Sequence, residues 1–553
     1  MDSKRPAAPD RPTPASLSHP VSPPLKKRRL AVPEPAAEKA PEDEKPTTAS
    51  RFPSPFKLTQ IRDLPPDMNR DCITLKDILG DPLISECWEF NYMHDIDFLM
   101  AAFDEDVRHL VKVHIVHGFW KREDHSRLAL QDAASRHANV TLHAAFMPEM
   151  FGTHHSKMMI LFRHDDTAQV VIHTANMILR DWTNMTQAVW ISPRLPLLQS
   201  AAGREGNADA EIGSGKRFKA DLLRYLRSYD TRRPTCKALV DRLVQHDFSA
   251  VRGALIASVP GRHHLDGPSG LFGWPALEQA LRSVPVSPGA AEIAIQISSI
   301  ATLGPTDSWL RGTFFNALSR GRRQSGPGPS SSSGASNPRI EETHSKPTFK
   351  VIFPTADEIR RSLDGYASGG SIHTKISSPQ QTRQLAYLRP IFCHWANDSG
   401  SSAGDSGSEI NYDNKELDAG RRRAAPHIKT YIRFAGGSGS DTPTIDWALL
   451  TSANLSKQAW GEAVTSAGEV RVASYEIGVL VWPGLYGEGA TMRATFRTDS
   501  LEDEAGGGES KAAVVALRMP YSLPLRPYGK TEVPWVATTS HHEPDWMGQV
   551  WNV

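Results

Sequence analysis

This 553-residue sequence has only four cysteines, no long apolar run and almost no net charge. The cysteines are widely spaced and form no Cys-x-x-Cys pair, so zinc is poorly supported and we expect reduced thiols in an intracellular compartment. No run approaches the roughly eighteen apolar residues of a transmembrane helix, and the N-terminus has no apolar signal core, so we expect neither a membrane-spanning nor a secreted protein. A net charge of +1 neither demands nor excludes nucleic acid as a partner. The cysteines are Cys72, Cys87, Cys236 and Cys393.

Aromatic residues are missing from the N-terminal segment, in which the first is Phe52. Residues 1–55 are rich in proline, alanine, serine and charge and cannot bury enough apolar surface to fold, so we expect a disordered tail. The Lys-Lys-Arg-Arg cluster at residues 26–29 is typical of a nuclear import signal. Such clusters are also found as solubilising charge runs, but the flanking prolines keep this one extended and accessible, which favours import and a nuclear protein.

The remaining sequence has the composition of a soluble globular protein, with 39% hydrophobic and 23% charged residues in the whole chain. It is too long for one ordinary core, so we predict two domains, 56–264 and 265–553. The boundary is placed in segment 262–270, where the pattern breaks and where His263 and His264 are interpreted as linker residues. Gly/Ser-rich stretches near 321–339, 397–423 and 502–511 predict flexible insertions in the second domain.

Strands that alternate with helices predict an α/β layered fold. In the first half we expect a helix within 86–103, where apolar residues recur at helical spacing, and another at 126–138 between strands in 109–119 and 139–147. A hairpin of strands 158–162 and 168–173 follows, then a helix at 221–230 and a strand in 253–261 that ends the first domain. The second half is expected to contain a helix at 274–284 and strands at 292–304, 429–434, 445–450 and 474–482.

One motif occurs once in each half of the chain. Each copy has a His-x-Lys, a short strand, a turn, a second strand and an Asn that closes an HTAN or TSAN tetrapeptide. Successive side chains of a strand point to opposite faces, so the His and Lys of each copy face the same way. A single His-x-Lys indicates only a core histidine beside a solvated lysine, but two copies together suit a phosphodiester, which needs cationic donors, a nucleophile and an acid. The residues are His155, Lys157 and Asn176 in the first copy and His427, Lys429 and Asn454 in the second.

The motifs HHSKMM and HTAN, and then HIKTY and TSANLSKQAW, resemble those of the phospholipase D superfamily and, within it, the tyrosyl-DNA phosphodiesterase family. The resemblance runs from about residue 58 to 551, apart from the Gly/Ser-rich stretches, and includes FNYMHDID, VHGFW, WTNMTQAVW, SSIATLG, SYEIGVL and DWMGQVW. The general superfamily pattern His-x-Lys-x4-Asp would place an Asp where this chain has Phe162 and Phe434. This departure looks like the tyrosyl-DNA phosphodiesterase branch and argues against a phospholipid hydrolase.

The resemblance implies two similar phospholipase D-like domains, each a mixed sheet sandwiched by helices, related by a pseudo-two-fold axis with the active site between them. It implies a nuclear DNA repair enzyme that hydrolyses the 3′-phosphotyrosyl bond between topoisomerase I, or another 3′ adduct, and DNA. The resemblance further implies a reaction through a covalent phosphohistidine that leaves a 3′-phosphate. The partners it implies are single-stranded or nicked DNA 3′ ends that carry a tyrosyl peptide. No cofactor and no membrane are implied, and a monomer suffices because each half supplies one motif.

The resemblance implies that His155 is the nucleophile and that His427 is the general acid and later the base that activates water. The Lys and Asn residues of both motifs hold the phosphate oxygens. Gln187 and Glu476 are partners of the two histidines in a crossed arrangement. The residues implied to contact the DNA backbone or to line the substrate channel are Tyr92, Phe151, Ser298, Ser299 and Ser456.

Two identical imidazoles need different surroundings if one is to act as nucleophile and the other as acid. Uncharged Gln187 beside one ring and Glu476 beside the other would supply the difference, because a carboxylate that accepts from a ring N–H fixes its tautomer and raises its basicity. The lysines supply the positive charge that a metal would otherwise supply, so we expect no metal. The alternatives are a surface position for Gln187, a pairing with lysine for Glu476, and core packing for Tyr92, Phe151 and Trp460.

Two other functions stay open at this stage. One is a different superfamily activity, a broad nuclease or a phosphatidyl transferase, which Phe162 and Phe434 and the absence of a membrane-binding helix disfavour. The other is a non-catalytic module that binds DNA ends, which the two complete motifs disfavour.

Overall fold

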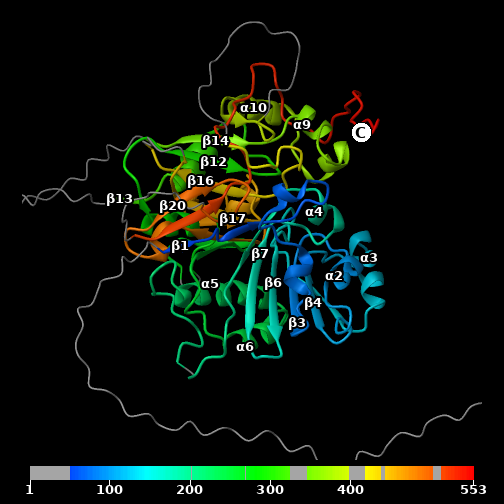
Figure 1. Ribbon diagram of the computed structural model, residues 1–553, viewed down its shortest axis with the longest axis vertical. Helices are drawn as coiled ribbons and strands as arrows, with labels where there is room; N and C mark the ends of the chain where they lie inside the picture. Colours follow the sequence, from blue (N-terminus) through cyan, green and yellow to red (C-terminus); the bar gives the residue numbers. More distant parts are fainter. Residues whose placement is uncertain are drawn as a thin grey trace, which may run out of the picture. The chain divides into compact units, whose positions relative to one another are not determined.

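Two mixed sheets of seven strands each form the framework of the protein (Figure 1). In sheet order, the first contains β2 (Phe56–Leu58), β8 (Ala188–Ile191), β7 (Ala168–His173), β6 (Met158–Arg163), β3 (Ile84–Phe90), β4 (Lys112–His117) and β5 (Val140–Ala144). The second contains β15 (Phe392–Cys393), β14 (Thr348–Ile352), β12 (Glu292–Gln296), β16 (Thr430–Phe434), β17 (Ile445–Thr451), β19 (Glu476–Val481) and β9 (Ala254–Ser258).

The computed structural model describes residues 50–200, 202–267, 270–323, 346–397, 417–436, 442–501 and 512–553. The basic cluster at 26–29 and most of the three expected Gly/Ser-rich insertions lie outside these ranges. The described residues all belong to one compact unit, which includes both sheets. Within the described ranges, no helix is long and apolar enough to cross a bilayer.

The two sheets have the same topology, strand for strand. Each has a central hairpin, β6–β7 or β16–β17, and the first hairpin strand is antiparallel to a neighbour that begins a parallel run of three strands. In each sheet the strand that comes first in the chain, β2 or β9, closes the opposite edge. The chain is therefore an internal duplication whose second copy begins at β9.

The boundary expected after His264 lies inside this second copy. The strand assigned to the end of the first domain is β9, which pairs with β19 more than two hundred residues later. The segment that follows is not a linker either, because β10 (Gly261–His264) pairs with β18 (Glu469–Val472). His264 Nε2 lies 3.0 Å from a carboxylate oxygen of Glu469, and His263 hydrogen-bonds to the carbonyl of Val259.

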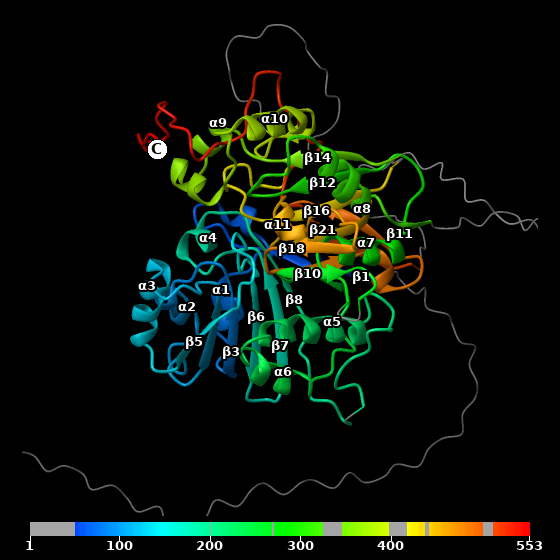
Figure 2. The same ribbon diagram turned by 180° about the vertical axis from the view of Figure 1, so that it is seen from behind.

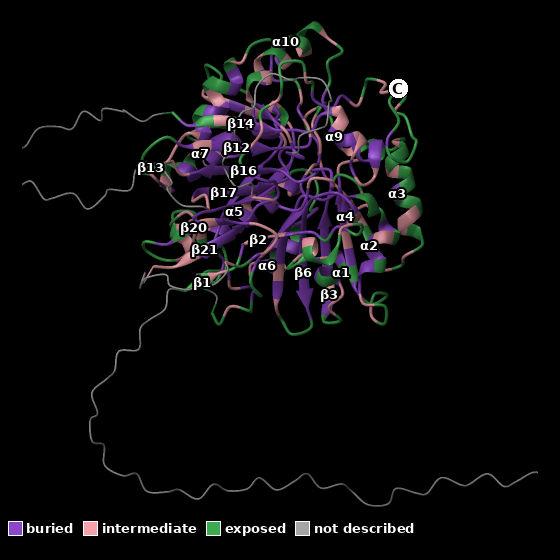
Figure 3. Ribbon diagram, turned by 45° about the horizontal axis from the view of Figure 1, so that its top comes forward, coloured by how far each residue is buried: buried purple, intermediate pink, exposed green. Residues whose placement is uncertain are grey.

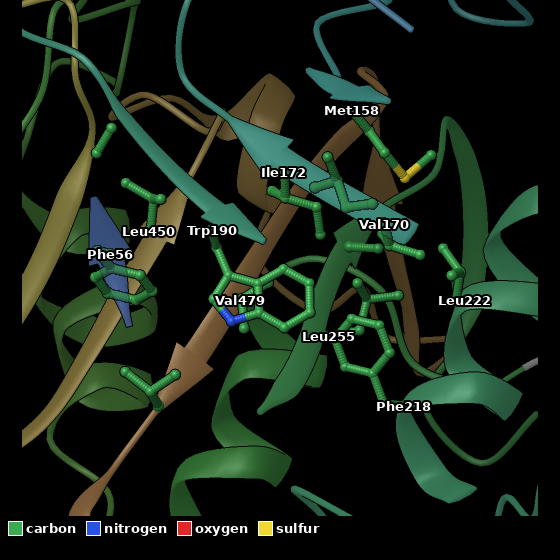
Figure 4. Packing of buried hydrophobic residues seen from close by; sticks show 14 of the residues in the cluster. Phe56, Met158, Val170, Ile172, Trp190, Phe218, Leu222, Leu255, Leu450 and Val479 are labelled. Atoms are coloured by element: carbon green, nitrogen blue, oxygen red, sulfur yellow. The ribbon is translucent and has the colours of Figure 1, made fainter. Parts of the chain in front are cut away.

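The two sheets share one apolar core. Side chains alternate along each strand, so one face of β7 and β8 presents Ile172 and Trp190 to Leu450 of β17 and Val479 of β19 (Figure 4). The helix α5 (Gly215–Arg227) adds Phe218 to the same cluster. Both hairpins are buried along almost their whole length, as Figure 3 shows. The ends of the hairpin strands from the two copies are thereby held at one place.

Helices cover the outer faces of the two sheets (Figure 2). On the first sheet these are α1 (Leu75–Leu79), α2 (Ile96–Ala102) and α3 (His125–Ser135), and on the second α7 (Trp274–Ser283) and α8 (Asn316–Leu318). The other α-helices are α4 (Leu179–Thr183), α6 (Lys237–Leu243), α9 (Ala356–Arg360), α10 (Pro379–Leu388) and α11 (Lys457–Trp460). The result is a pair of α/β layers, as the resemblance implied.

Part of the expected N-terminal tail is ordered. The strand β1 (Arg51–Phe52) pairs in parallel with β21 (Val514–Arg518), which lies beside β20 (Thr491–Thr495). The hydroxyl of Ser54 accepts a hydrogen bond from the backbone N–H of Arg518 at 3.0 Å. The two phenylalanines at positions 52 and 56 give this stretch the apolar surface that the preceding residues lack. The remaining short strands are β11 (Pro285–Val286) and β13 (Arg322–Arg323).

The helix expected within residues 86–103 is wrong for its first half, which forms β3. Cys87, Trp88 and Phe90 are all buried, and they lie on both faces of a strand inside the sheet. A strand buried on both faces has no polar alternation, so its apolar pattern is easily taken for a helix. The second half is helical, as α2. The expected helices that became α3, α5 and α7 and the hairpin β6–β7 are confirmed.

Candidate active site

The two His-x-Lys motifs lie at the starts of β6 and β16, and each is tied to the other copy. The backbone N–H of His155 donates to the carbonyl of Tyr475 at 3.0 Å, and the N–H of His427 donates to the carbonyl of Thr186 at 3.1 Å. Tyr475 leads into β19, and Thr186 leads into β8. The backbone of each histidine is therefore held by the residue that directly precedes its own side-chain partner, Glu476 for His155 and Gln187 for His427.

The ring of His155 is oriented by Glu476 from the second copy. Its Nδ1 lies 2.9 Å from Glu476 Oε2, which also accepts from the hydroxyl of Ser452. Burial alone would raise the pKa of Glu476, but His155 and Ser452 outweigh burial and lower it, so the carboxylate is ionised. An ionised carboxylate only accepts, so Nδ1 carries the proton. Burial also lowers the pKa of His155 against the opposing charge of Glu476, which leaves a neutral ring with a lone pair on Nε2.

The ring of His427 faces two side chains from the first copy. Its Nδ1 lies 3.0 Å from Asp181 Oδ2 and 3.0 Å from Gln187 Nε2. Thr174 Oγ1 donates to Gln187 Oε1 at 2.8 Å, which fixes the orientation of the amide. The crossed arrangement expected for Gln187 and Glu476 is therefore present. Burial lowers the pKa of His427 to about 3, against the opposing charge of Asp181.

Asp181 was missed, and it changes the expected difference between the histidines. Burial would raise its pKa, but His427 and the backbone N–H of Asn176 outweigh burial and lower it. Both rings therefore face an ionised carboxylate, and the expected contrast of one charged and one uncharged partner is wrong. A comparison of the two copies would have found this residue. When ANMILRDW (175–182) is aligned with ANLSKQAW (453–460), Asp181 stands opposite Ala459.

Lys157 and Lys429 are both buried, and both lie close enough to the two histidines to lower their pKa values further, beyond the effect of burial. The ammonium of Lys157 donates to the carbonyl of His155 at 3.1 Å, and that of Lys429 donates to the carbonyl of His427. Burial lowers the pKa of Lys157 to about 8. Burial, reinforced by the charge of Lys157, lowers the pKa of Lys429 well below its ordinary value. The nearby carboxylates already pair with the histidines, so an anion that enters between the lysines would relieve their repulsion.

The two asparagines of the motifs are fixed by different contacts. Asn454 Oδ1 accepts from the backbone N–H groups of Ser298 at 3.0 Å and Ser299 at 2.9 Å, which leaves its Nδ2 as the donor. The backbone N–H of Asn176 donates to Asp181 Oδ2 at 2.6 Å. Ser298 and Ser299 thus lie at the site, where their backbone amides orient Asn454.

The remaining expected substrate residues differ in their surroundings. The ring of Tyr92 lies 5.7 Å from that of His155, at the site. Phe151 is 75% exposed in the segment that precedes His155. The hydroxyl of Ser456 caps α11 by accepting from the N–H of Ala459. Trp460 is buried, so its core-packing interpretation is confirmed.

A chain of buried side-chain hydrogen bonds runs behind the first motif. His154 Nδ1 lies 2.9 Å from the carbonyl of Asn91, so Nδ1 is the donor. Burial lowers the pKa of His154 to about 3, so the ring is neutral and Nε2 accepts from the hydroxyl of Tyr229 at 3.1 Å. Tyr225 then donates to Tyr229 at 2.8 Å, and Ser156 donates to Tyr225. His154 and Ser156 point away from His155 and Lys157, so this chain fixes the motif from its opposite face.

No group of three or more His, Cys, Asp or Glu side chains that could hold a metal ion occurs among the described residues. The expectation that the reaction needs no metal stays a prediction.

Comparisons with known proteins agree on one family. The model of the family described as tyrosyl-DNA phosphodiesterase matches residues 55–529. A relative from Schizosaccharomyces pombe named "Probable tyrosyl-DNA phosphodiesterase" is 30% identical, over 90% of this chain and 95% of that protein. "Tyrosyl-DNA phosphodiesterase 1" from Arabidopsis thaliana is 29% identical, over 91% and 77%. A crystal structure of the yeast tyrosyl-DNA phosphodiesterase superposes with a TM-score of 0.56 at 20% identity, over 88% of this chain and 99% of that one, which shows the shared fold.

Proposed function

Because this chain belongs to the tyrosyl-DNA phosphodiesterase family of phosphoric diester hydrolases, we propose that it removes tyrosyl peptides, including those of topoisomerase I, from the 3′ ends of DNA. One observation carries the proposal: two histidines, each with a carboxylate on Nδ1, lie close to two buried lysines. The lysines suit the non-bridging oxygens of a phosphodiester, and the histidines suit the two sides of its phosphorus.

In the first step His155 Nε2 attacks the 3′ phosphorus. A P–N bond forms, the bond from phosphorus to the tyrosine oxygen breaks, and His427 gives its Nε2 proton to the departing phenolate. In the second step neutral His427 takes a proton from water, and the resulting hydroxide displaces His155 to leave a 3′-phosphate. Glu476 stabilises the positive charge that His155 acquires on attack.

His427 must hold a proton when the substrate is bound. In the free enzyme, burial and the neighbouring Lys429 keep its pKa at about 3. A phosphodiester anion between the lysines offsets their charge, and Asp181 remains on Nδ1, so substrate binding raises the pKa of His427 toward the working pH. Protonation of the acid is thus coupled to occupation of the phosphate site.

The proposal is tested with labelled 3′-phosphotyrosyl DNA in EDTA. Wild-type protein should yield a 3′-phosphate product, and His155→Ala should release no tyrosine. His427→Ala keeps the nucleophile but lacks the base for water, so it should accumulate a covalent phosphohistidine on a denaturing gel. An adduct in the His155 variant would reverse the two roles. Internal cleavage would indicate a nuclease, and binding without turnover an inert DNA-end module.

We further propose that the enzyme acts in the nucleus as a monomer. The cluster at residues 26–29 supports import, and each copy of the duplicated unit already supplies one half of the site. Replacement of residues 26–29 by alanine should shift a fluorescent fusion out of the nucleus, whereas unchanged nuclear accumulation would remove this assignment. Light scattering of the purified chain tests the monomer.

A further inference from the structure

Cys72 lies against a buried arginine. It follows η1 (Pro66–Asn69) and is half-buried, and its Sγ lies 2.8 Å from a terminal guanidinium nitrogen, Nη2, of Arg421. Arg421 is only 1% exposed. It belongs to the segment that leads to His427, six residues further along the chain. The contact therefore joins the N-terminal part of the fold to the segment that carries the second motif.

The guanidinium of Arg421 lacks a full set of acceptors. Among the described residues, its Nε and Nη1 have no hydrogen-bond partner. Burial is the main cause that lowers the pKa of Arg421, and the positive charge of Arg518 nearby lowers it further. Cys72 exerts the largest influence in the opposite direction. A buried guanidinium with unpaired N–H groups beside a sulfur can donate hydrogen bonds to an oxygen that is added to that sulfur.

The other three cysteines have the opposite surroundings. Burial raises the pKa of the Cys393 thiol to about 12. Burial also raises the pKa values of Cys87 and Cys236 well above the ordinary value, with the nearby carboxylates adding to the shift. These thiols are fully buried and stay protonated, so they are inert toward electrophiles. Only Cys72 combines access to solvent with a cationic neighbour.

We propose that Cys72 is an oxidative modification site that reacts selectively with hydroperoxides and whose oxidised form is held by Arg421. The sulfur attacks one peroxide oxygen of hydrogen peroxide, an S–O bond forms and the O–O bond breaks. The departing hydroxide takes a proton to become water, and the two electrons lost by sulfur reduce the peroxide. The sulfenic oxygen then accepts from the unpaired N–H groups of Arg421. This site is independent of the proposed catalytic function.

The expected rate follows from the contact between Cys72 and Arg421. A hydrogen bond from a charged group that holds the reacting atoms changes a rate by about tenfold or more. Native Cys72 should therefore react about tenfold faster than Cys72 in the same protein unfolded in urea.

The test exposes the full chain to a small excess of hydrogen peroxide at pH 7 and traps sulfenic acid with dimedone. Peptide mass spectrometry then gives the rate at each cysteine. Cys72 should carry the adduct, while Cys87, Cys236 and Cys393 stay unmodified until urea is added. Arg421→Gln should lower the Cys72 rate to that of the unfolded chain. Arg422→Gln is the matched control, because this neighbouring guanidinium pairs with Asp418 instead.

The buried cysteines also report on folding in every variant. If they become reactive in Arg421→Gln, that variant has unfolded, and Arg421→Lys, which retains the charge, takes its place with an intermediate rate expected. The proposal is overturned if native Cys72 reacts no faster than in urea. It is equally overturned if Arg421→Gln leaves the Cys72 rate unchanged while the other cysteines remain protected.

Discussion

Asp181 Oδ2 lies 3.0 Å from His427 Nδ1, whereas the equivalent position in the second copy of the duplicated unit is Ala459. The duplication is thus symmetric in strands and in the two His-x-Lys motifs but asymmetric in this carboxylate. The Nδ1 of His427 contacts Asp181 and Gln187, while the Nδ1 of His155 contacts Glu476. A carboxylate on Nδ1 stabilises an imidazolium, which suits the histidine that must act as acid.

Asp181→Asn should slow the first step without abolishing it. The substitution keeps the shape but removes the charge that stabilises protonated His427, and a hydrogen bond to a charged group contributes about 1.5–3 kcal/mol, or about 10- to 150-fold in rate. The loss should be greater for the tyrosyl ester than for an ester of a more acidic phenol, which needs less help from an acid. Single-turnover rates with both substrates measure this.

Gln187→Ala is the comparison for that experiment. It removes an amide beside the same ring and leaves the carboxylate, so its effect should depend less on the leaving group. Equal leaving-group dependence in both variants would contradict the assignment of Asp181 to the acid.

Lys157→Ala should lower the rate constant by about 100- to 1000-fold, because a lost charge-stabilising contact at the transition state costs about 2.7–4 kcal/mol. Lys157→Arg should restore only part of it, since the planar head group has a different geometry. The pKa of Lys429 should rise in Lys157→Ala, because the neighbouring charge that helps to lower it is gone. NMR of labelled lysine side chains measures that pKa, and turnover within a few-fold of wild type would exclude the shared phosphate site.

The sequence predicted the parts of the site that repeat. The hairpin β6–β7 and the two motifs could be recognised because strand, turn and motif lie close together in the chain. Glu476 stood out as a charge in an otherwise apolar strand, and it does meet His155. Asp181 lies in a helix of only five residues, where a charged side chain is not unusual, so only the alignment of the two copies, with Ala459 opposite, sets it apart.

Long-range pairing explains the remaining errors. The strand Ala254–Ser258 looked like the end of the first domain, since no local pattern shows that it pairs with β19. The strand Ile84–Phe90 looked helical because it is largely buried on both faces and so lacks the alternation of apolar and polar residues. The first feature depends on which strand lies beside Ala254–Ser258, and the second on what covers the two faces of Ile84–Phe90. Only the folded structure determines either of them.

Tyr229→Phe should weaken the buried hydrogen bonds that fix His154 and Ser156, the residues next to His155 in the first motif. It removes the hydroxyl that donates to His154 and accepts from Tyr225, so two buried polar groups lose a partner. Each such loss costs about 1–3 kcal/mol of unfolding free energy. If these hydrogen bonds position His155, the rate of adduct formation should fall while the KM for DNA changes little. Urea unfolding and single-turnover kinetics separate the two effects.

Tyr475→Phe is the matched control. The hydroxyl of Tyr475 donates to the carbonyl of Ser228 at 3.4 Å, and it takes no part in the hydrogen bonds that run from His154 to Ser156. It should leave adduct formation near the wild-type rate. An equal loss in both variants would mean that the tyrosine cluster acts through packing alone.

Buried histidines should make the fold sensitive to acid. Burial is the main cause that lowers the pKa values of His117, His154, His173 and His427 to about 3, whereas histidines of an unfolded chain titrate near 6.5. Between these values the unfolded chain binds more protons than the native one. The contribution of these histidines to the unfolding free energy should therefore be constant above about pH 6.5 and fall as the pH drops toward 3, by up to about 1.4 kcal/mol per unit for each histidine.

His173→Leu tests that sign at a single position. Leucine fills this buried position with a side chain that cannot titrate. Because one proton fewer is taken up on unfolding, the slope of unfolding free energy against pH between 4 and 6 should decrease by about 1.4 kcal/mol per unit. Urea unfolding at pH 8 and pH 5 measures the difference, with the variant gaining on wild type as the pH falls. An unchanged slope would show that His173 is already protonated in the native protein, contrary to its burial.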